Sequence, residues 1–328
     1  MKWLTDSWYR IHPVRIALLP LSMLYVLAIT FRKLAYRFGL LKKHRLSVPV
    51  IVVGNLTVGG TGKTPVVIWL AKQLQQAGHT PGIISRGYGG HADHYPQLVN
   101  PDSDPKTVGD EPVIISRQTE CPVAVAPKRI DAARLLQKQY KCSIIISDDG
   151  LQHYALERDI EIVVVDGMRY FGNRYCLPAG PLREPITRLR HIDFAILNGG
   201  PRDAQYKMLL DAGLATNLLD PTVRKPLADF KGQVVHSIAG IGHPERFFSY
   251  LNTQGLAIEP HYFADHYQYN FEDINFTDNQ PIIMTEKDAV KCQAFATGNM
   301  WYIPVEAVIS GDLTQQLLSK LAGTTSNE

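Results

Sequence analysis

From residue 48 onward, short apolar runs rich in β-branched residues alternate with segments of helical periodicity. Several of these runs are apolar throughout, which is typical of strands covered on both faces. The alternation predicts parallel strands joined by crossover helices, and therefore an α/β fold with a mostly parallel sheet flanked by helices. The predicted strands cover residues 50–54, 82–85, 123–126, 143–147, 160–166, 194–198, 234–238 and 281–285.

An apolar run at residues 16–31 precedes these elements, with Arg15 before it and Arg32 and Lys33 after it. The run is shorter than the roughly 20 residues needed to span hydrocarbon. Pro20 weakens it further, so we expect a helix that lies in or dips into a membrane interface. The aromatic residues expected at headgroup depth are Trp3, Trp8, Tyr25 and Tyr36. A buried core helix stays open as an alternative, whereas the second basic cluster and the lack of a small-residue cleavage site argue against a signal peptide.

The polar stretch at residues 199–231 contains a helix-like run followed by Asp220-Pro221 and Lys225-Pro226. A stretch of this kind is typical of a boundary between subdomains. We therefore expect an N-terminal membrane-associated helical segment at residues 1–47, a core at 48–230 and a smaller C-terminal α/β subdomain at 231–328.

The composition, with 45% hydrophobic and 20% charged residues, is that of a folded protein. Residues 1–45 hold nine Lys or Arg against one acid, Asp6, so the rest of the chain carries 25 bases against 30 acids. A basic, apolar N-terminus on an acidic body favours an anionic lipid surface as the partner and argues against nucleic acid. The four cysteines form no C-x-x-C pair, which indicates a reducing compartment and provides no metal motif.

A glycine-rich segment joins the first predicted strand to a helical pattern. A strand, a glycine loop and a helix in this order bind phosphate, because backbone N–H groups and the positive helix N-terminus face the phosphate oxygens. Lys63 is placed to reach the outer phosphates, and the Thr64 hydroxyl suits Mg²⁺. Thr57 stands where the strict Walker A pattern has glycine, so Gly59 and Gly60 are expected to supply the flexibility. The predicted nucleotide-binding residues are Thr57, Val58, Gly59, Gly60, Thr61, Gly62, Lys63 and Thr64.

Two acidic pairs follow further along the chain. Asp148 and Asp149 come directly after the predicted strand at 143–147, at the strand end where a P-loop holds phosphates, and carboxylates there bind Mg²⁺ in the Walker B arrangement. A turn with solvated carboxylates is the alternative. Asp110 and Glu111 precede a helical run at 113–118, and by themselves they indicate only acids in a first helical turn.

Seven motifs occur in the following order: GNLTVGGTGKTP (54–65), SRGYG (85–89), GDEP (109–112), DDGLQH (148–153), LPAGPLREP (177–185), FADH (263–266) and TEKDA (285–289). This series resembles the tetraacyldisaccharide 4'-kinase (lipid A 4'-kinase) family, and it is far more specific than a P-loop alone. The resemblance implies an ATP-dependent transferase that moves the γ-phosphoryl group to the 4'-hydroxyl of a tetraacyldisaccharide 1-phosphate in lipid A (lipopolysaccharide) biosynthesis. It also implies a P-loop NTPase-like core, a smaller C-terminal subdomain and an N-terminal helix docked on the inner membrane.

The resemblance also assigns roles to residues. In the family, the acid of the G-D-E-P loop pairs with the histidine of the F-x-D-H motif to deprotonate the sugar hydroxyl, which maps onto Asp110 and His266. The basic residues of other motifs map onto Arg86, Arg129 and Arg183 as candidate phosphate contacts. Lys63 and Arg183 are then expected to stabilise charge during transfer. ATP and Mg²⁺ are the implied cofactors, and the candidate metal ligands are Thr64, Glu111, Asp148 and Asp149.

The guanine-selective N-K-x-D pattern is absent, which favours ATP over GTP, and Asn198 is a candidate adenine contact. The alternative functions are a P-loop regulatory or assembly NTPase at the membrane and a membrane-attached protein that only binds nucleotide. We expect a monomer, monotopic or peripheral, at the cytoplasmic face of the bacterial inner membrane, acting on an acylated disaccharide phosphate lipid.

Overall fold

The computed structural model describes residues 5, 7–10 and 13–325, which group into two compact units. The first unit comprises Met1–Arg86, Cys121–Leu209 and Ala307–Glu328, and the second comprises Gly87–Glu120 and Leu210–Glu306. These units do not follow the predicted ranges 48–230 and 231–328. Residues 87–120 group with the second unit because their helix α5 (Asp110–Thr119) packs on α8 (Glu286–Cys292).

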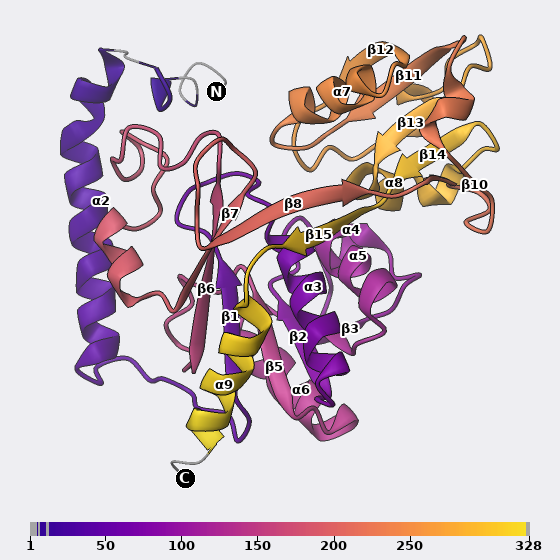
Figure 1. Cartoon of the computed structure of the whole chain (residues 1–328). Coiled ribbons are helices and arrows are strands. Elements are labelled where there is room, and N and C mark those ends of the chain that lie inside the picture. Colours follow the sequence, from indigo (N-terminus) through magenta and orange to yellow (C-terminus); the bar gives the residue numbers. More distant parts are fainter. Residues whose placement is uncertain (1–4, 6, 11–12, 326–328) are drawn as a thin grey trace. The chain divides into compact units, whose positions relative to one another are not determined.

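A parallel sheet forms the core of the first unit, with the strand order β7-β6-β1-β5-β2-β4 (Figure 1). Its strands are β1 (Val50–Gly54), β2 (Pro81–Ser85), β4 (Val123–Val125), β5 (Ile144–Asp148), β6 (Ile160–Asp166) and β7 (Phe194–Asn198). Nearly every residue in them is buried, which confirms the predicted strands covered on both faces. Helix α3 (Lys63–Gln76) packs on β1, β2 and β5, and α6 (Arg129–Tyr140) packs on β2 and β4.

The pairing of β1 determines where the polar loops of the first unit lie. Strand β1 pairs in parallel with β5, so that Val53 lies opposite Asp148, and on its other side with β6. The carboxyl ends of β1 and β5 therefore reach the same edge of the sheet, which is the edge where parallel α/β folds bind ligands.

Strands β8 (Tyr206–Ala212) and β15 (Val305–Ile309) are neighbours, and each runs from one unit into the other (Figure 1). The helix-like run expected within 199–231 is wrong. This stretch forms β8, β9 (Ala215–Asn217), β10 (Arg224–Lys225) and a 3₁₀ helix, η2 (Leu227–Phe230). Pairing of β8 with β7, which places Tyr206 opposite Ile196, overrides the local helical pattern.

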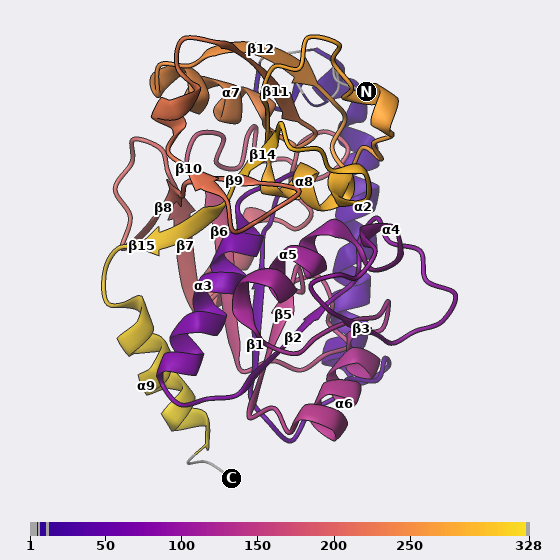
Figure 2. The ribbon, with the colours of Figure 1, turned by 90° about the vertical axis from the view of Figure 1, so that its right-hand side faces the viewer.

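Helix α2 (Val14–Arg37) belongs to the first unit and extends well beyond the predicted apolar run (Figure 2). Its 24 residues are long and apolar enough to cross a membrane by length and composition. Only 6% of the most apolar 18-residue stretch of this helix is buried in the protein. This low burial argues against the alternative of a buried core helix. Its strongly exposed apolar side chains are Ile16, Leu21, Met23, Leu24, Leu27 and Phe31.

The other side of α2 is attached to the first unit by polar bonds. Ser22 Oγ donates to the carbonyl of Cys176 at 2.8 Å, and the Tyr25 hydroxyl donates to the carbonyl of Arg183 at 2.9 Å. Trp8 is also buried and its indole donates to the Pro178 carbonyl at 3.0 Å, so the polar groups of Trp8 and Tyr25 are engaged by the protein itself. Trp3 lies outside the described residues.

The second unit contains a smaller sheet, with β9 and β10 at one end and the strand order β14-β13-β11-β12 after them. Its other strands are β11 (Val234–Ala239), β12 (Ala257–Tyr262), β13 (Ile282–Thr285) and β14 (Met300–Ile303). Helices α7 (Pro244–Thr253) and α8 pack on it, over apolar clusters that include Phe230 and Trp301. The expected strands at 234–238 and 281–285 are confirmed within one residue at each end.

The other elements of the described residues are short, apart from α9. They are β3 (Gln97–Val99), α4 (Pro105–Val108), η1 (Ile186–His191), η3 (Phe271–Asp273), η4 (Gln293–Phe295) and α9 (Leu313–Thr325). Thr314 Oγ1 donates to Gln73 Oε1 at 2.9 Å, which joins α9 to α3 within the first unit.

Candidate active site

The glycine loop connects β1 to α3 in the first unit, as the sequence predicts. Gly59 and Gly62 have φ values of +98° and +91°, which only glycine adopts readily, so Gly59 supplies flexibility that Thr57 does not. Thr57 is buried and pairs with Leu182 across an isolated bridge. The Asn198 amide donates to the Thr61 carbonyl at 2.9 Å, and it therefore braces the loop from β7.

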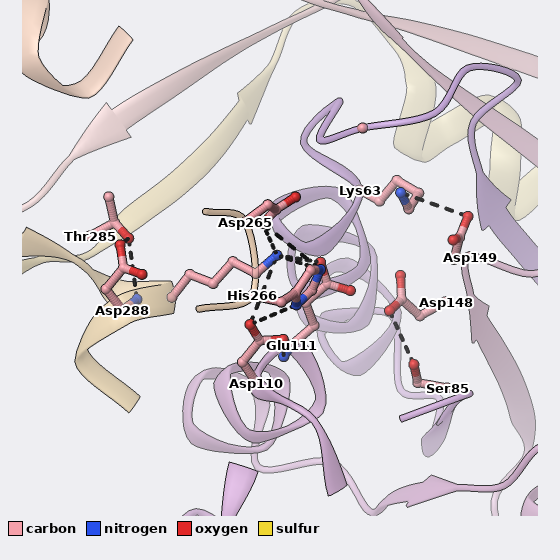
Figure 3. Close-up of polar contacts among 12 residues, drawn as sticks. Lys63, Ser85, Asp110, Glu111, Asp148, Asp149, Asp265, His266, Thr285 and Asp288 are labelled. Carbon is pink, nitrogen blue, oxygen red and sulfur yellow. Dashed lines mark hydrogen bonds and ion pairs between the residues drawn. The ribbon is translucent and has the colours of Figure 1, made fainter. Parts of the chain in front are cut away.

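Lys63 is the first residue of α3, and its side chain is almost fully buried. Its Nζ lies 3.7 Å from Asp149 Oδ1 (Figure 3). The guanidinium of Arg183 donates from Nη1 to both oxygens of the same carboxylate, at 3.1 and 2.9 Å. Burial alone raises the pKa of Asp149, but Lys63 and Arg183 outweigh it and lower the pKa. Asp149 is therefore ionised, and it aligns two cations beside the phosphate loop.

Asp148 ends β5 and is completely buried, with Oδ2 accepting from Ser85 Oγ at 3.3 Å (Figure 3). Arg129 is also buried and donates from Nη2 to the carbonyls of Asp148 and Asp149, at 3.5 and 3.3 Å. Burial lowers the pKa of Arg129 to about 10, so it remains a cation at neutral pH. Arg86 follows β2 and is exposed.

The donor set of the first unit fits a magnesium ion. Thr64 at the start of α3 and the carboxylates of Asp148 and Asp149 at the end of β5 all offer oxygen, the ligand that Mg²⁺ prefers. Glu111, the fourth predicted metal ligand, belongs to the second unit. Its Oε1 accepts from Lys287 Nζ at 3.3 Å.

Asp110 and His266 meet in the second unit, although 155 residues separate them along the chain. Asp110 begins α5 and is buried, and its Oδ2 lies 3.2 Å from Nδ1 of His266 (Figure 3). His266 has a left-handed φ of +60° and packs edge-on against Tyr88, with ring centroids 4.9 Å apart. Tyr88, Asp110 and His266 line one small pocket.

The charges around this pair favour its ionised form. Burial alone raises the pKa of Asp110, but His266 and Lys287 outweigh it and lower the pKa. The contact with Asp110 raises the pKa of His266 above its usual value, against the effect of burial. Asp110 is therefore ionised, and His266 holds its own proton more tightly than a free imidazole. A carboxylate in this arrangement can accept a proton from a hydroxyl group.

Lys287 is a residue of this site that the sequence reasoning missed. Its Nζ lies 3.3 Å from Asp265 Oδ1, 3.3 Å from Glu111 Oε1 and 3.9 Å from Asp110 Oδ2. Burial alone lowers the pKa of Lys287, but the three carboxylates outweigh it and raise the pKa. The sequence did contain a signal for Lys287, because it lies in the TEKDA motif of the family series and no role had been assigned to that motif.

The neighbouring acid of that motif has a structural role. Asp288 is completely buried and accepts from the Thr285 hydroxyl at 2.6 Å (Figure 3). It also accepts from the Tyr269 hydroxyl at 3.0 Å. Its carboxylate also lies 2.8 Å from Nζ of Lys291. These bonds fix α8 on its sheet, so that Lys287 projects from a rigid helix.

A parallel sheet with a glycine loop between β1 and α3, and with carboxylates at the end of the adjacent strand, defines a P-loop nucleoside triphosphate-binding protein. A family model described as tetraacyldisaccharide-1-P 4'-kinase matches residues 14–322, and the chain belongs to this family.

Curated relatives and a solved structure agree with this assignment. The tetraacyldisaccharide 4'-kinase of Nitrosococcus oceani is 54% identical over 96% of this chain and 93% of its own length. The enzyme of the same name from Methylobacillus flagellatus is 51% identical over 98% of this chain and 96% of its own. The crystal structure of the "apo" form of LpxK from Aquifex aeolicus in complex with ATP is 28% identical, with a TM-score of 0.79, and covers 94% of this chain and 99% of that chain.

Proposed function

We propose that this chain is an ATP-dependent kinase that transfers the γ-phosphoryl group to the 4'-hydroxyl of a tetraacyldisaccharide 1-phosphate in lipid A biosynthesis. The family and its named relatives support the activity. The observation that carries the proposal is the 3.2 Å contact between Asp110 and His266. A P-loop alone suits any nucleotide hydrolase, whereas a buried carboxylate paired with imidazole beside a pocket suits a kinase that must activate an alcohol.

On the nucleotide side, we propose that the loop from Thr57 to Thr64 binds the triphosphate of ATP through its backbone N–H groups. Lys63 and Arg183 then stabilise the charge that builds on the transferred group, and Asp149 keeps both cations in place. Arg86 is exposed and available to a phosphate oxygen, whereas Arg129 acts mainly by holding the carbonyls of the two aspartates.

Thr64, Asp148 and Asp149 would hold the Mg²⁺ that accompanies ATP, and when bound it neutralises charge on the β- and γ-phosphates. Glu111 is the fourth candidate ligand, and its carboxylate lies beside the cation of Lys287, as that of Asp149 lies beside Lys63 and Arg183.

On the acceptor side, we propose that Asp110 accepts the proton of the sugar hydroxyl as the hydroxyl oxygen bonds to the γ-phosphorus and the bond from that phosphorus to the leaving ADP breaks. His266 orients the Asp110 carboxylate and stabilises its charge, which keeps Asp110 ionised before transfer. Lys287 is a positioning residue, because it joins Asp110, Glu111 and Asp265 through one ammonium group. Proton transfer of this kind contributes about 10² to 10⁴ in rate.

We propose that the exposed apolar side of α2 docks the enzyme on the cytoplasmic face of the inner membrane as a monotopic or peripheral monomer. The acceptor carries acyl chains that stay in the bilayer, so the enzyme must reach it at the interface. Leu24 and Leu27 are more than half exposed, and cations flank the helix core. Deleting residues 1–40 would also remove the bonds of Ser22 and Tyr25, so point substitutions test this better than truncation.

A combined Leu24→Asp and Leu27→Asp variant should no longer sediment with vesicles that contain anionic lipid, while it still binds ATP. The matched control is Leu214→Asp with Leu219→Asp, two leucines of the second unit that are also about half exposed or more. Sedimentation of the α2 variant at the wild-type level would contradict the proposed docking surface.

The activity is tested by incubating the protein with Mg²⁺, γ-labelled ATP and tetraacyldisaccharide 1-phosphate, followed by separation of lipids from inorganic phosphate. The proposal predicts label in a glycolipid that carries a new 4'-phosphate. Label only in inorganic phosphate would instead support a hydrolysing NTPase, and label left in ATP would support a protein that only binds nucleotide.

A further inference from the structure

Two histidines and two carboxylates gather at the edge of the smaller sheet, and none of them takes part in the site described above. Strands β11 and β12 pair in parallel, with His236 opposite Glu259. His261 lies two positions beyond Glu259 on the edge strand β12, and alternate residues of a strand share a face. His236, Glu259 and His261 therefore direct their side chains to one place.

The donor atoms of these three residues lie within 4.8 Å of one another. His236 Nδ1 is 3.0 Å from His261 Nε2 and 3.7 Å from Glu259 Oε2. Nitrogen and oxygen atoms bound at about 2.0–2.2 Å to one tetrahedral ion are separated by distances of this order. The side chains thus need little movement to surround an ion.

Asp278 orients the other nitrogen of His236. Its Oδ2 and Oδ1 lie 3.0 and 3.2 Å from Nε2, and the Gln280 N–H donates to Oδ1 at 3.1 Å, which fixes the carboxylate. A carboxylate acceptor keeps the ring proton on Nε2, so the lone pair of Nδ1 faces His261 and Glu259. Histidines that bind metals in proteins are commonly held by a carboxylate in this way.

The surroundings hold the rings rigidly and leave one side open. Phe276 stacks on His236 with centroids 3.8 Å apart and an interplanar angle of 18°, and it lies 4.4 Å from His261. His236 is buried, whereas the side chain of Glu259 is 59% exposed. A bound ion would have three protein ligands and one position facing water.

We propose that His236, Glu259 and His261 form a Zn²⁺ site whose fourth ligand is water. Two imidazole nitrogens and one carboxylate oxygen are a donor set for Zn²⁺ and related late transition metals. Mg²⁺ prefers oxygen ligands throughout, so this site is chemically distinct from the one beside ATP. The ion would fasten the edge strand β12, which leads into the segment with Asp265 and His266, to β11.

The test uses untagged full-length protein in detergent, stripped of metals by chelation and titrated with Co²⁺ as a spectroscopic substitute for Zn²⁺. The wild type should bind one equivalent, show the visible absorption of tetrahedral Co²⁺ and lose it on addition of Zn²⁺. His261→Ala should abolish this absorption. Asp278→Asn should weaken binding by about 10- to 100-fold, the usual effect of losing a carboxylate behind a histidine ligand.

His94→Ala is the matched control, because it removes an exposed imidazole from the same unit and should leave the titration unchanged. Should His261→Ala fail to fold, Glu259→Gln replaces an exposed side chain and should still weaken binding. Zn²⁺ should also raise the thermal midpoint of the wild type and not that of His261→Ala. Absence of the absorption in the wild type, or its persistence in His261→Ala, would overturn the proposal and leave only a hydrogen bond between two histidine rings.

Discussion

The two units of the molecule obtain their reactive groups in different ways. In the first unit, the phosphate loop is one continuous segment, and the strand beside it supplies the carboxylates. In the second unit, Asp110 and His266 come from separate segments, Gly87–Glu120 and Leu210–Glu306, that pack together. The first arrangement depends on local backbone conformation, whereas the second depends on tertiary packing of α5 and α8, so substitutions should affect the two differently.

Within the first unit, the largest effect should come from Lys63. Lys63→Ala removes a buried cation that pairs with Asp149, and we expect phosphoryl transfer to fall by about 100- to 1,000-fold, as for loss of one preorganised electrostatic contact. Label transfer from ATP to the lipid measures this. Lys138→Ala, on an exposed position of α6, should transfer at the wild-type rate, and an equal loss in both variants would point to general instability instead.

Arg183→Lys should have a smaller effect on the same unit. Lysine keeps the charge but cannot reproduce the contact of the guanidinium with both oxygens of Asp149. Loss of one charge-assisted hydrogen bond of about 1.5 kcal/mol corresponds to about tenfold in rate. The turnover number should fall accordingly, while exposed Arg190→Lys should not change it. A turnover number unchanged by Arg183→Lys would show that charge alone matters here.

A pH series tests the second unit. The pKa of His266 is raised on folding, so its stabilisation is complete below its usual value of 6.5 and is lost as pH rises through the raised pKa. The pKa of Asp110 is lowered, so its stabilisation is present above its usual value of 3.8 and is lost as pH falls through the lowered pKa. His266→Gln should therefore reduce the thermal midpoint most between pH 3.8 and pH 6.5, where both groups are charged in the folded protein.

The difference between wild type and His266→Gln should shrink at alkaline pH, where both imidazole and glutamine are neutral. His94→Gln, an exposed control in the same unit, should show no such dependence. A difference that stays constant from acid to alkaline pH would mean that the histidine contributes packing rather than charge.

The smallest effect should come from Gly60, in contrast with Gly62 in the same loop. An added Cβ at Gly62 would lie 2.5 Å from the Asn198 amide in a left-handed backbone conformation, whereas no atom of the described residues lies within 4 Å of a Cβ added at Gly60. Gly62→Ala should reduce the free energy of unfolding by about 1–2 kcal/mol or more. Gly60→Ala should change it by no more than about 0.5 kcal/mol. Chemical denaturation of both variants measures this, and equal losses would contradict the described loop.

The contrast between the units also explains which parts of the structure the sequence predicts. The sequence predicted the buried strands β1, β5, β6 and β7 correctly. Parallel strands covered on both faces form nearly continuous apolar runs, which can be recognised without knowledge of the fold. Strand β8 lies in the stretch 199–231, where a helix-like run was expected, and it was not predicted because its exposed Leu209 and Leu210 disturb the alternation and its pairing with β7 is a tertiary effect. Strand β12 is largely exposed and Pro-containing, so no apolar pattern marked it.

The residues of the candidate active site also differ in how far the sequence predicts them. The roles of Lys63 and Thr64 follow from their place at a strand-to-helix junction, without knowledge of the rest of the fold. The pairing of Asp110 with His266 came only from resemblance to a family, because no local pattern joins two residues so far apart. Lys287 was missed for the same reason, since its three carboxylate partners are distant from it in sequence.

The most direct test of this division between nucleotide binding and proton transfer is a single-turnover measurement on Asp110→Asn, with ATP affinity determined on the same preparation. We predict that ATP affinity is unchanged and that the rate of transfer to the lipid hydroxyl falls by about 10²- to 10⁴-fold. A variant that transfers phosphate at the wild-type rate, or that loses ATP binding in parallel with transfer, would contradict the account.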